Sequence, residues 1–159
     1  MTKTRHIPDF IWRWMRPFNR RLAQNFGPQS GMSDMVLLLT TTGRKSRLPR
    51  VTPLQFEEES GVFYIASARG TQADWFRNIL SDPNVEVQVR GRRFRALAEP
   101  VTDPGRIADF LTMRLERHPK MVGAMLRAEG LPRNFTRPDL EHFSAEKALV
   151  ILHPCEGEI

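Results

Sequence analysis

Alternating apolar and polar residues predict that most of this chain folds into short β-strands. Each run is rich in β-branched and apolar residues and ends at glycine, proline or charged turn residues. The predicted strands cover residues 35–41, 51–57, 62–67, 85–89, 93–101 and 147–153. Because most of the connecting turns are short, we expect mostly antiparallel pairing. The pattern predicts an α+β, mainly β fold of about six strands in a small closed or split barrel, with an open sheet as the alternative.

Helical periodicity marks the other segments. Residues 8–25 predict an N-terminal amphipathic helix, which we expect to pack on the domain, with an interfacial membrane helix as the alternative. A short helix is predicted at residues 71–80, between two strands. Apolar residues on one face of residues 105–117, and again after Pro119, predict a helical insert before the last strand. Residues 130–139 contain two prolines and predict a loop.

Two charged segments are predicted to be solvated. The acidic run at residues 57–61 ends in Ser-Gly and predicts a turn with an acidic tip. Arg90, Arg92 and Arg93 are predicted to lie at a hairpin tip, where charge protects the edge of a sheet. Neither segment is assigned a role beyond the fold.

A basic loop joins the first two predicted strands within residues 40–54, TTTGRKSRLPRVTPL. Gly43 turns the chain, and the cations that follow are Arg44, Lys45, Arg47 and Arg50. Guanidinium groups and backbone amides at the mouth of a sheet converge well on phosphate or carboxylate oxygens. A solvated basic hairpin is the alternative. A Walker A phosphate loop is excluded, because Leu38 stands where that motif needs its first glycine and Pro49 opposes a following helix.

Composition favours one globular domain in a reducing compartment. The chain has 159 residues, 40% of them hydrophobic, and a net charge of +6, which attracts polyanions without selecting one. Cys155 is the only cysteine, so no internal disulfide forms. With no secretory or membrane-spanning run, we expect a cytoplasmic protein that at most contacts the inner face of a membrane through its N-terminal helix.

Several chemistries lack their sequence signals. The four histidines are far apart and show no metal-ligand spacing, so no metal site is predicted. Neither a GxSxG nucleophile motif nor a GxGxxG dinucleotide motif occurs. If the chain is an enzyme, we expect a cofactor to supply the reactive group.

The motifs LLLTTTGRKS, PRVTPL, ASARG, DWFRN and DPNVEVQV follow one another between residues 37 and 89. In order and spacing they resemble the deazaflavin-dependent nitroreductase and quinone reductase family, whose members are split β-barrels that use coenzyme F(420). The resemblance implies hydride transfer from the reduced deazaflavin to an electron-poor acceptor such as a quinone, an enone or a nitro compound. It also divides the chain into an N-terminal helix and linker, residues 1–30, and a cofactor-binding split barrel, residues 31–159.

The resemblance implies a cofactor site in three parts. The phosphate and polyglutamate tail would be held by Arg44, Lys45, Ser46 and Arg50. The deazaflavin would be lined by Val51, Thr52, Pro53, Leu54 and Gln55, and by Ile65, Ala66, Ser67 and Ala68. The short helix would close the pocket with Asp74, Trp75, Phe76, Arg77 and Asn78. No catalytic side chain is assigned, because the helical insert lacks the tyrosines that family nitroreductases place near the substrate.

Three functional hypotheses remain at this point. The first is the F(420)-dependent reductase, acting on a small-molecule acceptor, with a homodimer compatible with the fold. The second is a related split barrel that uses FMN. The third is a non-enzymatic basic module for nucleic acid or acidic membrane, although no aromatic strip for base stacking is interleaved with the arginines, so no specific nucleic acid is expected.

Overall fold

The computed structural model describes residues 35–67 and 69–158. The predicted N-terminal helix and its membrane contact therefore lie outside the described residues, as does Ala68. A seven-stranded antiparallel sheet forms most of the described chain, in the order β2-β1-β5-β6-β7-β4-β3. The strands are β1 (Val36–Thr42), β2 (Pro49–Gln55), β3 (Glu57–Glu59), β4 (Val62–Ser67), β5 (Asn84–Val89), β6 (Arg92–Val101) and β7 (Ala148–Glu158).

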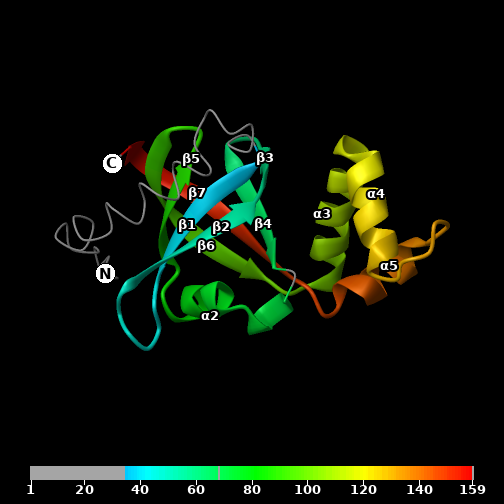
Figure 1. The fold of residues 1–159 in the computed structure, drawn as a ribbon, viewed down its shortest axis with the longest axis horizontal. Coiled ribbons are helices and arrows are strands. Elements are labelled where there is room, and N and C mark those ends of the chain that lie inside the picture. The colour runs from blue at the N-terminus through cyan, green and yellow to red at the C-terminus, as the bar shows by residue number, and fades with distance from the viewer. Residues whose placement is uncertain (1–34, 68, 159) are drawn as a thin grey trace.

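The sheet curls into a half-barrel, and the helices divide into two groups around it (Figure 1). A 3-10 turn, η1 (Gly70–Gln72), and α2 (Asp74–Ser81) lie at one end of the barrel. The helical insert stands beside the sheet and comprises α3 (Pro104–Arg117), α4 (Pro119–Ala128) and α5 (Arg137–Ser144). The predicted α+β, mainly β, split-barrel class is confirmed by this arrangement.

The two faces of β7 belong to two different hydrophobic cores. Ala148, Val150 and Leu152 are buried in the core inside the curled sheet, together with residues of β1, β4, β5, β6 and α2. Leu149 and Ile151 face the other way and pack in the core formed with α3, α4 and α5. Because side chains alternate along a strand, one apolar run can join both cores. The insert is therefore fixed to the half-barrel through the middle of the sheet.

Two segments differ from the sequence prediction. Residues 57–59 form β3 rather than a turn, so the turn is confined to Ser60 and Gly61. Residues 137–144, predicted in part as loop, form α5, because Thr136 and Asp139 make a capping box and Pro138 occupies the first turn, where proline is tolerated. Helix α3 begins with a side-chain cap, in which the Asp103 carboxylate accepts from the Arg106 backbone N–H at 2.8 Å.

The arginine-rich hairpin also has a different setting from the one predicted. Its strands, β5 and β6, lie inside the sheet and pair on both sides, so they have no edge to protect. Arg90 instead forms an ion pair with Glu58 at 2.6 Å, and Arg93 pairs with Glu86. No helix in the described part of the chain is long and apolar enough to cross a bilayer.

Candidate functional site

The basic loop between β1 and β2 is a closed turn with a defined backbone. The Gly43 N–H donates to the Leu48 carbonyl at 2.8 Å, and the Arg47 N–H donates to the Gly43 carbonyl at 2.8 Å. A Cβ at Gly43 would lie 2.5 Å from Ser46 Oγ and 3.1 Å from the Leu48 carbonyl oxygen, so a larger residue there would require Ser46 to rotate and the loop to shift slightly. Arg47 has a φ of 60°, and its exposed side chain does not line the cleft described next.

A cleft of about 450 Å³ lies between this loop, the start of β2 and α2. It brings together residues from all three elements. Its walls are Gly43, Arg44, Lys45, Ser46, Arg50, Val51, Thr52, Asp74, Trp75 and Asn78. The cations of the loop and residues of α2 therefore lie together at the end of the sheet, as the sequence predicts.

Asn78 joins α2 to the basic loop from a buried position. Its side-chain amide donates to Thr41 Oγ1 at 3.1 Å, and its carbonyl oxygen accepts from the Arg44 backbone N–H at 3.1 Å and from Arg44 Nη1 at 3.2 Å. Arg44 Nη2 also pairs with Asp74 at 3.1 Å. The Asn78 side chain is thus satisfied by the loop, and Arg44 is held in one orientation at the cleft wall.

Lys45 and Arg50 are the cleft cations with unused charge. Both are exposed, and within residues 35–67 and 69–158 no carboxylate pairs with either. Within the described part of the chain, the one hydrogen bond of Arg50 Nη2 is long, 3.4 Å to Ser46 Oγ. These donors remain available to an anionic ligand, and the donor set suits phosphate or carboxylate oxygens.

A second hollow lies at the far end of β2, between the sheet and the insert. This apolar groove has a volume of about 150 Å³. Its sheet side includes Gln55, Tyr64, Ala66 and Ser67, and its insert side is mostly apolar. Ser67 Oγ is buried and donates to the Gly70 carbonyl at 2.7 Å, so this hydroxyl already has an acceptor. Three of the residues predicted to line a cofactor ring thus border this groove, at the opposite end of β2 from the basic cleft.

Five other predicted site residues line neither hollow. Pro53 is exposed on β2, and Leu54 packs against the inner core. Ile65 and Phe76 are fully buried core side chains. Arg77 is exposed and donates to Gln72. The structure therefore brings nine of the predicted residues together in the basic cleft and three in the groove, and it places these five elsewhere.

Sequence reasoning missed the insert residues that line the groove. They are Ile107, Phe110, Leu111, Arg114, Met125, Glu129, Phe143 and Lys147. A signal was present for some of them, since the helical period puts Phe110 and Arg114 four residues apart on one face. In the described ranges, no group of three or more His, Cys, Asp or Glu residues is placed to hold a metal ion.

Replacing Asn78 with alanine is expected to lower the free energy of unfolding by about 2–4 kcal/mol, because Thr41 and the Arg44 N–H lose a buried partner. Urea unfolding measures this loss. Asn84→Ala, which removes a side-chain bond at a partly buried turn, is the control and should cost about 1 kcal/mol or less. Equal losses in the two variants would contradict the assigned position of Asn78.

The family of the chain follows from a match over most of its length. The model of the F420H(2)-dependent quinone reductase family matches residues 12–124. The chain belongs to this family. The match includes the basic loop, β2, β4 and α2, which form the cleft and one side of the groove.

A curated relative has the same family name, and two solved structures share the fold. An F420H(2)-dependent quinone reductase of Mycobacterium tuberculosis is 35% identical over 68 residues, which are 41% of this chain and 46% of the relative. The match thus spans about half the length of that curated relative. A structure titled F420 Reductase has a TM-score of 0.50 at 21% identity, covering 77% of this chain and 87% of its own. Another, titled F420-H2 Dependent Reductase, has a TM-score of 0.51 at 22% identity, covering 74% and 93%. At these identities the two structures support the split-barrel fold alone.

Proposed function

We propose that this chain is an oxidoreductase that passes hydride from reduced coenzyme F(420) to an electron-poor small molecule, with a quinone as the first class to test. One observation carries the proposal beyond family membership. Lys45 and Arg50 present positive charge, with no carboxylate partner among the described residues, to a cleft beside small and hydroxyl-bearing residues. An anionic tail of phosphate and carboxylates would neutralise that charge.

The residues of the cleft and of β2 fit this cofactor. Arg44, Lys45, Ser46 and Arg50 would bind the phosphate and the polyglutamate tail. From there β2 leads to Gln55, Ala66 and Ser67 at the groove, where the ring system would end. Bound there, the reduced deazaflavin supplies hydride chemistry that no side chain of the chain can supply.

The chain's own residues position and shield the reaction. Asn78 fixes Arg44, and the largely buried Trp75 side chain forms part of one wall of the cleft. Tyr64, Phe110 and the other apolar side chains exclude water from the groove. Holding the reacting partners in a dry, fixed geometry is the protein's main contribution to such a transfer.

We also retain two proposals on partners. A homodimer is supported by one solved structure, which is titled a domain-swapped dimer and has a TM-score of 0.54 at 20% identity over 89% of this chain and 98% of its own. Peripheral contact with the inner face of a membrane rests on the amphipathic pattern of residues 8–25.

Titration with oxidised coenzyme F(420) and with FMN, followed by fluorescence and by thermal unfolding, tests the cofactor. We expect F(420) alone to saturate and to raise the unfolding temperature, since only a ligand that binds the native state stabilises it. Saturation by FMN alone would favour the second hypothesis. Binding of neither, with oligonucleotide affinity that falls steeply with salt, would replace the enzyme with a basic binding module.

A further inference from the structure

A buried arginine of the insert has donors that nothing in the described chain uses. The Arg114 side chain is 9% exposed, and its Nε donates to Glu57 Oε1 at 3.2 Å. Its two terminal nitrogens, Nη1 and Nη2, form no hydrogen bond with any residue of the described ranges. A buried guanidinium with unused N–H groups is costly unless a ligand or water satisfies it.

Arg114 lies between two hollows of the molecule. It lines the apolar groove and also a wider polar concavity of about 710 Å³ on the side of β3. Its guanidinium carbon lies 6.0 Å from the centre of the Phe110 ring, which in turn stacks on Tyr64 at 5.9 Å with an angle of 18° between the rings. The groove therefore has a flat aromatic wall that leads to a cation.

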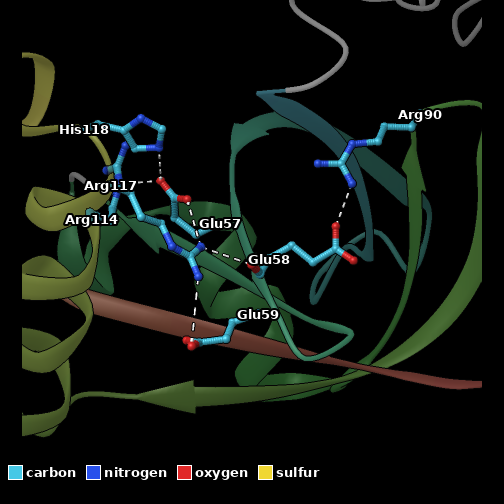
Figure 2. Close-up of polar contacts among 7 residues, drawn as sticks. All are labelled: Glu57, Glu58, Glu59, Arg90, Arg114, Arg117 and His118. Atoms are coloured by element: carbon cyan, nitrogen blue, oxygen red, sulfur yellow. Dashed lines mark hydrogen bonds and ion pairs between the residues drawn. The ribbon is translucent and has the colours of Figure 1, made fainter.

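The charge of Arg114 is only partly neutralised. Among the described residues, Glu57 is the only carboxylate that pairs with Arg114; it also accepts from Arg117 Nη1 at 3.4 Å and lies 3.2 Å from His118 Nε2 (Figure 2). One buried carboxylate is thus shared between two arginines and the His118 ring. Positive charge remains at the end of the groove and favours an oxygen that carries or develops negative charge.

We propose that Arg114 binds the oxygen of the hydride acceptor and so selects flat, lipophilic acceptors whose oxygen becomes negative on reduction. This inference rests on the proposed function, and it assigns the acceptor to the apolar groove. A groove of about 150 Å³ with mostly apolar walls has the size that holds one benzene ring. One ring of a quinone fits beside Tyr64 and Phe110, with its oxygen at Arg114 and its other end toward Gln55 and Ala66.

The chemistry of quinone reduction explains why a cation such as Arg114 would lie at the acceptor site. Hydride arriving at a quinone adds two electrons and one proton, which gives the hydroquinone monoanion and leaves F(420) oxidised. A second proton, from water, completes the hydroquinone. Arg114 stabilises the oxyanion between these two steps with N–H groups that are fixed before the reaction.

Direct binding of two naphthoquinones to the purified chain tests the proposal. Menadione is neutral, whereas lawsone carries an ionised hydroxyl at neutral pH and resembles the charged product. We expect the wild type to bind lawsone more tightly, and Arg114→Met to reduce that preference by about tenfold or more, the effect of one charge-assisted hydrogen bond. Arg114→Lys keeps the charge and should keep part of the preference.

Arg117→Met is the matched control. Arg117 is another cationic partner of Glu57, but it does not line the groove. The variant should therefore leave the ratio of lawsone to menadione affinity unchanged. Arg114→Met should also lower kcat for menadione reduction by at least about tenfold while F(420) affinity is kept. An equal effect of the two variants, or an equal loss of both naphthoquinones in Arg114→Met, would overturn the proposal in favour of a structural arginine.

A separate F(420) titration of the wild type distinguishes the two proposals. If the chain does not bind F(420) but its preference for lawsone depends on Arg114, the proposed cofactor is rejected and the proposed acceptor site in the groove is supported. If the chain binds F(420) normally but its preference for lawsone does not depend on Arg114, the proposed acceptor site in the groove is rejected and the proposed reductase function is retained.

Discussion

Replacing Lys45 and Arg50 together with alanine is expected to weaken coenzyme F(420) binding by about 2–5 kcal/mol, because each side chain would lose a charge-assisted hydrogen bond to the anionic tail. Both cations line the basic cleft and lack a carboxylate partner in the described chain, so no internal ion pair is broken. Fluorescence titration with the oxidised cofactor measures the change in affinity. Thermal unfolding of the free protein should change little, since both side chains are exposed.

The double variant Arg47→Asn with Arg69→Ala is a control that removes the same number of positive charges. Arg47 and Arg69 are exposed and do not line the cleft, and asparagine tolerates the positive φ of position 47. Affinity for the cofactor should fall by less than about 1 kcal/mol in this control. Equal losses in the two double variants would mean that net charge, rather than the cleft, holds the ligand.

Replacing Glu57 with glutamine is expected to lower the free energy of unfolding by about 3–5 kcal/mol, the usual cost of removing one partner of a buried ion pair. Glu57 is 8% exposed on β3 and contacts Arg114, Arg117 and His118 at the C-terminal end of α3 (Figure 2). The variant leaves Arg114 buried without its carboxylate. Urea unfolding at neutral pH measures the loss.

Glu59→Gln, on the same strand, is the control for Glu57. Its side chain is 53% exposed and its carboxylate is 4.0 Å from Arg117, so we expect a loss of at most about 1 kcal/mol. The pair Glu57→Leu with Arg114→Met removes both buried charges and should recover part of the stability lost in Glu57→Gln. A Glu57 variant as stable as the Glu59 variant would show that the cluster is solvated, as its sequence alone had predicted.

The strands and the basic cleft could be predicted because local sequence decides them. Alternation identified the sheet, and Gly43 with its neighbouring cations identified the loop. The run at Glu57 could not be read in this way, since an acidic tripeptide before Ser-Gly is typical of an exposed turn. It forms a strand because α3 supplies its cationic partners from some sixty residues away in sequence.

The apolar groove was missed for a related reason. Its two sides come from β4 and from the insert, and no local pattern says which face of α3 turns toward which strand. Helical periodicity places Phe110 and Arg114 on one face of the helix, but it does not show that this face, with its arginine, turns toward the sheet and is buried. The basic cleft could be predicted because one hairpin provides most of its residues. The groove could not, because its residues come from elements that are far apart in the sequence.

The alternation of β7 between the two cores constrains how this protein can be re-engineered. An insert taken from a relative must fit Leu149 and Ile151, whose neighbours Ala148 and Val150 are already packed on the opposite face. A graft that moved this strand by one position would exchange the two sets of side chains and disturb both interiors at once. Changes of acceptor preference are therefore more safely made by substitutions along α3 and α4 than by transplanting the whole helical segment.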